Sequence, residues 1–555
     1  MIISSKHRIE IPPVDVLSYI FEKSTQSAGL PTYINAEDSA QNFTKPELET
    51  LVRKLGSGLR ELGGLQQGDV VLVCAENSIW YPVTILGTLC AGGIFTGANP
   101  AYTITELAHQ LNVSSAKFII TDRERLPTVL KVAQAERTPR KNIFLIDGGE
   151  DRPPGGDVRH LSELLNHGQL QWERIDDLEV ASQRTAVLNF SSGTTGPPKA
   201  CMVTHHNLVA NAEQSMHLDE MARVRKSDPT YATGDVHCAY VPLYHASKLF
   251  LACHFCILNV RRDCTTVIMP KFSLTSLLDA IQQFRITYLL VVPPVAVLLT
   301  KSPLLSGYDV SSVKFLLCGA APLGRDTSMQ LEKLFSANGA RTRQGWGMTE
   351  ATCSVTLFAP DEFDRTHSGV GYLVANMEAK IVTDEGKEVS YGEEGEAVIR
   401  GPNIFKGYHQ NEAATKQAWT EDGWLKTGDY VVVQPDGLFS VVDRKKEFIK
   451  VKGFQVSPSE LESHLLECDE VKDCAVIRVE RDGQEHPQAH VVSHRKEVTA
   501  DSILKFMDGR LSAHKKLTGG VVFTHEIPKS PSGKILRRLI KDPYSSNAVK
   551  ERTRL

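Results

Sequence analysis

Residues 191–199 read SSGTTGPPK and directly follow the apolar run AVLNF. The hydroxyl groups, the backbone amides beside Gly193 and Gly196, and the Lys199 ammonium are groups that bind phosphate oxygens. A Walker loop needs GxxxxGK followed by serine or threonine, whereas two prolines precede Lys199 and Ala200 follows it. We therefore predict a polyphosphate-binding loop outside the P-loop class. Its expected contacts are Ser191, Ser192, Gly193, Thr194, Thr195, Gly196 and Lys199.

Two later glycine-rich segments supply further parts of a nucleotide site. Residues 317–324 read LCGAAPLG, and residues 344–350 read QGWGMTE. Trp346 stands between two glycines and presents an aromatic face on which a purine can stack. Glu350 places a carboxylate near the polyphosphate, and carboxylates are side chains that bind Mg²⁺. A tryptophan buried in the core and a solvated glutamate would give the same sequence pattern. Other segments are therefore needed to assign these two residues to a nucleotide site.

Two charged residues complete the set. Asp429, in KTGDY, has a carboxylate that can accept hydrogen bonds from two ribose hydroxyls. Lys534 lies in PKSPSGKILRR, a segment rich in Pro, Ser and Gly ahead of a basic run. An exposed lysine is by itself only a surface charge, so Lys534 gains a role only from the motifs around it.

The segments that must position these motifs alternate between helices and short strands. Residues 44–64 predict a helix, because Thr44 can cap it and leucines recur at helical spacing. Residues 69–74, 117–121 and 142–147 are short apolar runs typical of strands. This alternation predicts an α/β fold, whose large N-terminal part contains helix-covered, mainly parallel sheets and a small β-barrel-like region.

The pattern changes near residue 440. Residues 422–442 form two alternating runs around PDG, which predicts a β-hairpin. A basic run, DRKKEFIKVKGF, follows, and SPSELESHLLE at residues 457–467 then predicts a capped helix within a small α+β region. We therefore predict an N-terminal adenylation domain over residues 1–442 and a C-terminal lid domain over residues 443–555.

Composition limits the classes of partner. The 62 basic and 66 acidic residues give a formal charge of −4, which argues against nucleic acid as the main partner. No stretch approaches the uninterrupted apolar length of a membrane span, and the first residues lack the apolar core of a secretory signal. We expect a cytoplasmic protein, with the peroxisomal matrix as an alternative because TRL at residues 553–555 is similar to the SKL import signal.

The eleven cysteines lie mostly within apolar runs, which predicts reduced, buried thiols. Cys253 and Cys256 form CHFC, a spacing that also occurs in metal and redox sites. The surrounding run is apolar and no second CxxC occurs in the chain, so we expect no metal there.

Six segments occur in one order across residues 191–538: SSGTTGPPK, GAAPLG, QGWGMTE, KTGD, DRKKEFIKVKGFQVSPSELE and PKSPSGKILRR. Together they resemble the signatures of the ANL adenylate-forming superfamily, which contains acyl-CoA synthetases, nonribosomal peptide adenylation domains and luciferases. VKGFQVSPSELE and the VPP of residues 292–294 are most similar to the coumarate:CoA ligase branch. The resemblance implies an AMP-forming acid:CoA ligase that uses ATP, Mg²⁺ and coenzyme A on an aryl or medium-chain acyl acid of a specialised pathway. It leaves the acid unidentified.

The resemblance also implies roles in acyl-adenylate formation. By motif position, Lys534 bridges the substrate carboxylate and the α-phosphate, and Thr349 contacts the phosphate. Trp346, in place of the usual tyrosine, stacks on adenine, while Asp429 and Arg444 hold the ribose and Glu350 binds the metal. The remaining nucleotide contacts implied by motif position are Gly319, Ala320, Ala321, Gln344, Gly345, Gly347, Lys446 and Lys450.

For thioester formation the resemblance implies that the small C-terminal domain is mobile and rotates about a hinge at Lys446. Lys450 then serves the second step, and Lys452 with Gly453 binds coenzyme A along the pantetheine tunnel. For Lys445 we expect an ordinary solvated charge.

His245, in VPLYHASKLF, matches the family histidine that flanks the acyl pocket and gates coenzyme A entry. The next residues depart from the family pattern, because Ala246, Ser247 and Lys248 replace a glycine and large side chains. The implied acyl pocket consists of His245, Ser247, Ala320 and Gly345.

Three other functions share parts of this pattern. A stand-alone adenylation enzyme would load a carrier-protein thiol, and no LGxxS-like carrier segment follows Lys534. A luciferase-like oxygenase would share almost every motif. A catalytically inactive nucleotide sensor is disfavoured because Lys534, Glu350 and Asp429 are all present.

Overall fold

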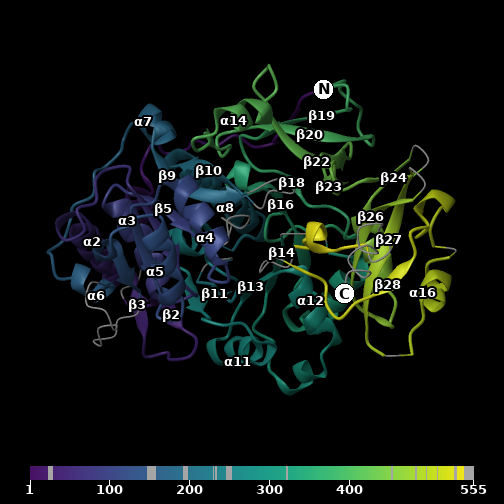
Figure 1. Cartoon of the computed structure of the whole chain (residues 1–555), viewed down its shortest axis with the longest axis horizontal. Coiled ribbons are helices and arrows are strands. Elements are labelled where there is room, and N and C mark those ends of the chain that lie inside the picture. Colours follow the sequence, from purple (N-terminus) through teal and green to yellow (C-terminus); the bar gives the residue numbers. More distant parts are fainter. Residues whose placement is uncertain are drawn as a thin grey trace.

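The structure is a computed structural model of the 555-residue chain. It describes residues 1–22, 29–146, 158–191, 198–228, 230–231, 234–244, 253–319, 323–451, 454–481, 484–495, 497–508, 510–529 and 534–542. A large N-terminal part, drawn from purple to green, lies beside a small C-terminal part in yellow (Figure 1). No helix within the described ranges is both long and apolar enough to cross a membrane.

An eight-stranded sheet has the order β21-β10-β9-β5-β4-β6-β7-β8. The strands from β9 to β8 run parallel, and β10 and β21 add an antiparallel edge. The strands are β4 (Val70–Cys74), β5 (Ile94–Gly97), β6 (Phe118–Thr121), β7 (Ile143–Leu145), β8 (Arg159–His160), β9 (Thr185–Ser191), β10 (Lys199–Thr204) and β21 (Gly407–Tyr408). The three strands predicted near residues 69, 117 and 142 are therefore confirmed.

Strand β4 shows why its sequence, VVLVC, is apolar at every position. Val71 and Val73 belong to one buried cluster, together with residues of the helices on that face. Val70 and Leu72 point the other way, into a second cluster. Both faces are covered, as expected for a parallel sheet. The covering helices are α2 (Lys45–Glu61) and α3 (Trp80–Cys90) on the first face, and α4 (Ile104–Ser114) and α5 (Leu126–Ala135) on the second.

A seven-stranded sheet, parallel except at the β2–β3 edge, has the order β15-β14-β13-β11-β12-β2-β3. The first buried cluster contains residues of both large sheets, so the two sheets share one core. The strands are β2 (Pro31–Asn35), β3 (Asn42–Thr44), β11 (Val236–Ala239), β12 (Thr265–Ile268), β13 (Tyr288–Val291), β14 (Phe315–Cys318) and β15 (Thr342–Gln344). Further helices of the N-terminal part are α1 (Val16–Phe21), α6 (Leu161–Leu164), α7 (Leu178–Gln183), α8 (His205–Lys226), α10 (Asn259–Arg261), α11 (Leu274–Phe284), α12 (Pro293–Lys301) and α13 (Arg325–Leu334).

The region expected to be β-barrel-like contains two antiparallel sheets. One has the order β1-β19-β20-β22-β23, and the other is β16-β17-β18. The predicted hairpin is confirmed as β22 and β23, and Gly437 in its PDG turn has φ +92°, which glycine adopts readily. The elements are β1 (Ile3–Ser4), β16 (Trp346–Gly347), β17 (Ser354–Leu357), β18 (Tyr372–Leu373), β19 (Glu378–Val382), β20 (Glu394–Arg400), β22 (Leu425–Val433), β23 (Phe439–Arg444) and helix α14 (Glu412–Ala418).

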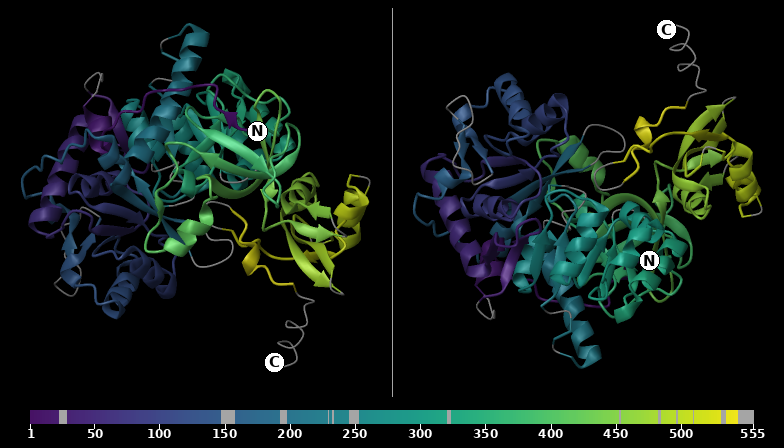
Figure 2. Two further views of the ribbon diagram at one scale, coloured as in Figure 1. Left: turned by 90° about the horizontal axis from the view of Figure 1, so that it is seen from above. Right: turned by 90° about the horizontal axis from the view of Figure 1, so that it is seen from below.

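The C-terminal part has a buried cluster of its own, whose members run from Ile449 to Leu517. The predicted cap of its first helix is present, because the Ser457 side chain accepts a hydrogen bond from the Glu460 N–H. Figure 2 shows this part projecting from one side of the molecule. Its elements are β24 (Ile449–Val451), β25 (Phe454–Val456), α15 (Pro458–Leu466), β26 (Val471–Arg481), β27 (Gln484–Ser493), α16 (Ala500–Met507) and β28 (Val521–Phe523).

The CHFC segment lies in a π-helical turn, Cys253–Leu258. Cys256 is buried there, and burial raises the pKa of its thiol to about 12. Of the cysteines whose side chains the structure describes, all are free thiols and all except Cys353 are buried. Short 3₁₀ helices occur at Arg140–Asn142, Pro303–Gly307, Ser336–Asn338, Thr349–Ala351, Ala513–Lys515 and Arg537–Leu539.

Candidate active site

A cavity of about 1450 Å³ lies between the N-terminal and C-terminal parts. The ends of the parallel strands β13 and β14 open into it, which is the usual position of ligand sites in α/β sheets. Strands β16, β22 and β23 contribute one wall, and α15 and the segment around Lys534 contribute another. The described candidate residues that line it are Ser191, Lys199, Gly319, Gln344, Gly345, Trp346, Gly347, Thr349, Glu350, Asp429, Arg444, Lys446 and Lys534.

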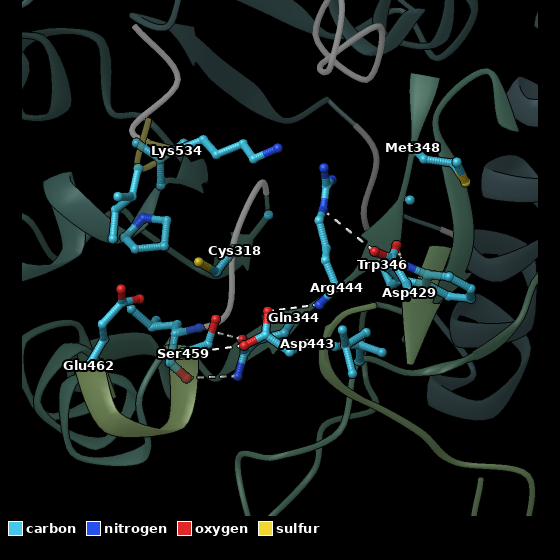
Figure 3. Close-up of a pocket in the computed structure, with 18 of the residues that line it drawn as sticks. Cys318, Gln344, Trp346, Met348, Asp429, Asp443, Arg444, Ser459, Glu462 and Lys534 are labelled. Carbon is cyan, nitrogen blue, oxygen red and sulfur yellow. Dashed lines mark hydrogen bonds and ion pairs between the residues drawn. The ribbon is translucent and has the colours of Figure 1, made fainter. Parts of the chain in front are cut away.

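Asp429 and Arg444 are brought together by the hairpin. They are directly opposite residues of the antiparallel pair β22–β23, and Nε of Arg444 lies 3.5 Å from Oδ1 of Asp429. The other carboxylate oxygen, Oδ2, accepts a 2.8 Å hydrogen bond from Nε1 of Trp346 (Figure 3). The hairpin, with a register shift between Tyr430 and Val431, thus joins two of the predicted nucleotide contacts to a third.

Trp346 is buried, with only 6% of its surface exposed, and its ring stacks on Phe439 with centroids 6.2 Å apart. The glycines beside it serve backbone packing. A Cβ atom on Gly347 would lie 1.7 Å from the Cys353 carbonyl oxygen, and one on Gly345 would lie 2.7 Å from a methyl carbon of Leu357. Gly319 differs, because a Cβ there would meet nothing within 4 Å and would reduce the cavity instead.

The ends of the SSGTTGPPK segment are adjacent because β9 and β10 are antiparallel neighbours. Ser191 pairs with Lys199 in the register, and Lys199 projects toward the ring of Tyr408, with Nζ 4.5 Å from its centroid. The Tyr408 hydroxyl donates a 2.8 Å hydrogen bond to Oε1 of Glu350. Sequence reasoning missed Tyr408; its only signal was an aromatic residue in the otherwise polar KGYHQN.

The donor set near Glu350 fits Mg²⁺. This ion takes one or two carboxylates and keeps several waters, and Glu350 is a partly exposed carboxylate at the cavity wall. One of its oxygens, Oε1, accepts the hydrogen bond of Tyr408. Thr349 lines the same cavity.

Lys534 reaches the cavity from the C-terminal part and extends toward the guanidinium of Arg444 (Figure 3). Burial lowers the pKa of its ammonium to about 8, and the positive charge of Arg444 adds to this effect. The negative charges of Glu447 and Asp429 oppose it. Lys534 is therefore a cation whose charge is sensitive to pH just above neutrality.

Arg537 anchors the segment that carries Lys534. Its guanidinium donates to both carboxylate oxygens of Glu462 at 2.7 Å, pairs with Glu447, and donates through Nε to the Val476 carbonyl oxygen at 3.0 Å. Burial raises the pKa of Glu462 to about 7, and the Arg537 charge opposes that increase. Sequence reasoning did not select these residues, because each motif was considered without its partners.

The charged residues at the end of β23 and just after it contact both parts of the molecule. Asp443 accepts hydrogen bonds from the Ser457 hydroxyl at 2.5 Å and from the Ser459 N–H at 3.1 Å, at the start of α15. The expectation that Lys445 is an ordinary solvated charge was wrong. Its ammonium pairs with Asp384 at 2.7 Å and Glu396 at 2.9 Å, and these hydrogen bonds raise its pKa despite the opposing effect of burial. Lys446 is exposed at the cavity wall.

Two predicted contacts are less directly supported. Lys450 is exposed on β24, lies outside the cavity wall, and donates its backbone N–H to Glu485 at 2.6 Å. A nucleotide contact by Lys450 is therefore not supported in this arrangement. The side-chain amide of Gln344 forms hydrogen bonds with backbone groups of Leu323 and His367, so it connects segments of the cavity wall.

Several predicted sites lie outside the described residues. They are Ser192, Gly193, Thr194, Thr195, Gly196, His245, Ser247, Ala320, Ala321, Lys452, Gly453 and the TRL of residues 553–555. Their roles stay predictions from the sequence.

Comparison with known proteins agrees with this geometry. The family model described as AMP-binding enzyme matches residues 21–409, and the AMP-binding enzyme C-terminal domain matches residues 460–534. The chain is 34% identical over 552 residues to phenylacetyl-CoA ligase epaB of Aspergillus niger, covering 98% of this chain and 99% of that one. It is 36% identical over 535 residues to 4-coumarate-CoA ligase 1 of Narcissus pseudonarcissus, covering 94% and 92%.

Among solved structures, ATP-bound MatB from Rhodopseudomonas palustris is similar, with a TM-score of 0.82 and 26% identity over 97% of this chain and 100% of that one. The likeness extends over both the N-terminal and the C-terminal parts, and it agrees with the ordered motifs and the cavity that joins them. The chain therefore belongs to the AMP-binding enzyme family, within the ANL superfamily of adenylate-forming enzymes.

Proposed function

We propose that this protein is an ATP-dependent acid:CoA ligase that forms an acyl-adenylate and then transfers the acyl group to coenzyme A. The observation that carries the proposal is that one cavity is lined by three sets of charged groups. They are Lys534, the Asp429–Arg444 pair, and Lys199 with Glu350, which both contact Tyr408. These groups suit three neighbouring parts of the substrates: the reacting carboxylate, the ribose and the polyphosphate.

In the first step, a carboxylate oxygen of the acid bonds to the α-phosphorus of ATP while the bond to the bridging oxygen breaks and pyrophosphate leaves. Two anions must approach each other, so positive charge at the reacting centre lowers the barrier. Lys534 supplies this charge, and Arg444 with Asp429 holds the ribose. Lys199 attracts the departing phosphates. Mg²⁺, when held by Glu350, would neutralise further phosphate charge.

In the second step, the coenzyme A thiol loses its proton and its sulfur attacks the acyl carbonyl, so that AMP leaves. The structure has Lys534 at the cavity and Lys450 exposed outside it, an arrangement suited to the first step. We assign the two domains to residues 1–442 and 443–555, and we expect rotation about Lys446 to exchange Lys534 for Lys450. The separate buried cluster of the C-terminal part supports this division.

The substrate we propose has an apolar body, of the aryl or medium-chain acyl class. Part of the cavity wall is formed by aliphatic and thioether side chains, and apolar walls favour apolar ligands. The side chains that form this wall are Val241, Leu290, Val292, Leu317, Met348 and Leu357. The phenylacetyl-CoA and 4-coumarate-CoA ligases named above act on acids of this kind, which supports the proposal.

Pyrophosphate release tests this function directly. The purified chain is incubated with MgATP and a panel of phenylpropenoic, phenylacetic, benzoic, medium-chain and short dicarboxylic acids, with and without coenzyme A. We expect pyrophosphate and AMP with an apolar acid, and a new acyl-CoA only when coenzyme A is present. Lys534→Ala should slow adenylation by about 10²- to 10³-fold, the usual cost of one stabilising group at a reacting centre.

The same assay separates the alternatives. An enzyme that loads a carrier protein would catalyse acid-dependent ATP–pyrophosphate exchange and form no acyl-CoA. A luciferase-like oxygenase would consume oxygen after adenylation. Absence of acid-dependent pyrophosphate release across the whole panel would rule out the proposed ligase.

A further inference from the structure

Tyr408 contacts two groups of opposite charge on the phosphate side of the cavity. Its hydroxyl donates a 2.8 Å hydrogen bond to Oε1 of Glu350, and its ring lies beneath the Lys199 ammonium, 4.5 Å from Nζ to the centroid. Only 8% of Tyr408 is exposed, although it lines the same cavity. One side chain therefore contacts both the loop lysine and the carboxylate suited to a metal ion.

The backbone holds Tyr408 firmly in this place. Strand β21 pairs with β10, with Tyr408 opposite Cys201, two residues beyond Lys199. Just before it, the Phe405 N–H donates a 2.8 Å hydrogen bond to the backbone oxygen of Glu350. The Tyr408 N–H itself donates to Oγ1 of Thr415 at 2.9 Å. The segment is thus bound to both phosphate-side motifs.

The two contacts leave the charges available to a ligand. A cation over an aromatic ring is attracted by the ring face without being neutralised by an anion. In the described part of the chain, no ion pair joins Lys199 to Glu350, although both line the same wall. A direct pair would satisfy both charges and compete with phosphate and metal for them.

We propose that Tyr408 is a positioning residue for the Mg²⁺–triphosphate part of ATP, which holds the Glu350 carboxylate and the Lys199 ammonium apart and oriented toward the cavity. This inference rests on the proposed function for the identity of the nucleotide. It goes beyond that function by assigning a residue outside the motifs and a selectivity: Tyr408 favours MgATP over AMP, which has no β- and γ-phosphates.

Two substitutions separate the two contacts. Tyr408→Phe keeps the ring beneath Lys199 and removes the hydroxyl, whereas Tyr408→Leu removes both. Tyr372→Phe is a matched control, because Tyr372 also has a lysine over its ring, Lys6 at 4.9 Å, and a carboxylate partner, Asp436 at 3.5 Å. Tyr372 is absent from the wall of the large cavity.

Equilibrium binding of MgATP and of AMP is measured for each variant by calorimetry, without acid or coenzyme A. Loss of a hydrogen bond to a charged group predicts about tenfold weaker MgATP binding for Tyr408→Phe. Loss of the ring contact predicts a further weakening of about threefold for Tyr408→Leu. Affinity for AMP should change less than twofold in both, and Tyr372→Phe should match the unmodified protein for both ligands.

The ratio of the MgATP and AMP dissociation constants does not depend on the fraction of protein that is folded. The same comparison can therefore be made for a less stable variant. An unchanged ratio in Tyr408→Phe would overturn the inference, whether both affinities stay the same or both fall together. In a double-mutant cycle, the hydroxyl effect should disappear in a Glu350→Ala background. An equal effect in that background would also overturn it.

These outcomes are distinct from a failure of the proposed function. If MgATP binding depends on Tyr408 but no acid causes pyrophosphate release, the ligase proposal is wrong and this inference stands. If the protein is a working ligase but substitution of Tyr408 leaves the ratio of the MgATP and AMP dissociation constants unchanged, the ligase proposal stands and this inference is wrong.

Discussion

Nε1 of Trp346 donates a 2.8 Å hydrogen bond to Oδ2 of Asp429. The aromatic wall proposed for adenine and the carboxylate proposed for ribose are therefore joined directly. A tyrosine, the usual residue of the family at this position, has its donor at the far end of a different ring. The substitution of tryptophan thus preserves an aromatic face and also supplies an N–H donor to Asp429.

Trp346→Phe should weaken ATP binding while keeping the aromatic ring. The Asp429 carboxylate would lose one donor and be less well oriented, so we expect about a tenfold higher KM for ATP with a smaller change in kcat. Steady-state kinetics checks this. Trp172→Phe is the control, because Nε1 of Trp172 donates to the Ser18 hydroxyl at 3.0 Å within the core. Equal KM changes in both variants would contradict a specific role for Trp346.

The rate of adenylation should fall as pH rises past the pKa of Lys534. That pKa is lowered to about 8, so the ammonium is charged below this value and loses its proton above it. Because kcat/KM reports the free enzyme, its basic limb for pyrophosphate release should have an apparent pKa near 8.

Lys534→Arg tests the origin of this limb. A guanidinium keeps its proton throughout the range, so the limb should move to higher pH in that variant, at a lower overall rate. A limb that stays near pH 8 in Lys534→Arg would assign it to another group.

Lys450→Ala should separate the two half-reactions. Lys450 is exposed and lies outside the cavity wall, so acid-dependent ATP–pyrophosphate exchange should stay within about twofold of the unmodified rate. Acyl-CoA formation should fall strongly if Lys450 enters the site for the second step. Lys505→Ala, on α16 of the same part, is a control of equal charge change. A comparable loss of both half-reactions would contradict the proposed exchange of lysines.

Two glycine-to-alanine substitutions should have opposite consequences. At Gly347 the new Cβ would lie 1.7 Å from the Cys353 carbonyl oxygen, so the backbone must shift and the free energy of unfolding should fall by about 1–3 kcal/mol or more. At Gly319 nothing lies within 4 Å, so Gly319→Ala should stay as stable as the unmodified protein. Its Cβ enters the cavity and should raise KM for the acid or ATP. Thermal unfolding and steady-state kinetics distinguish the two; equal melting temperatures for both variants would contradict this account.

Local sequence was sufficient for most elements. Thr44 directly precedes the helix from Lys45 to Glu61, Ser457 caps α15, and the PDG turn joins β22 to β23. These features could be predicted because capping and turn formation depend on neighbouring residues. The ordered motifs also indicated the family before any distance was known. The apolar run of residues 69–74 predicted a strand, and side chains on both faces of β4 are buried.

Only the tertiary structure decided the partners of each side chain. Tyr408 lies 58 residues from Glu350 in the sequence, and Arg537 lies 75 residues from Glu462, so no spacing rule could pair them. Lys445 was expected to be solvated, yet Asp384, two residues after β19, and Glu396 on β20 both pair with it. The sequence determined which chemical groups are present and the local elements that carry them. Their pairing, and hence their charge and orientation, depends on contacts between distant segments that exist only in the folded chain.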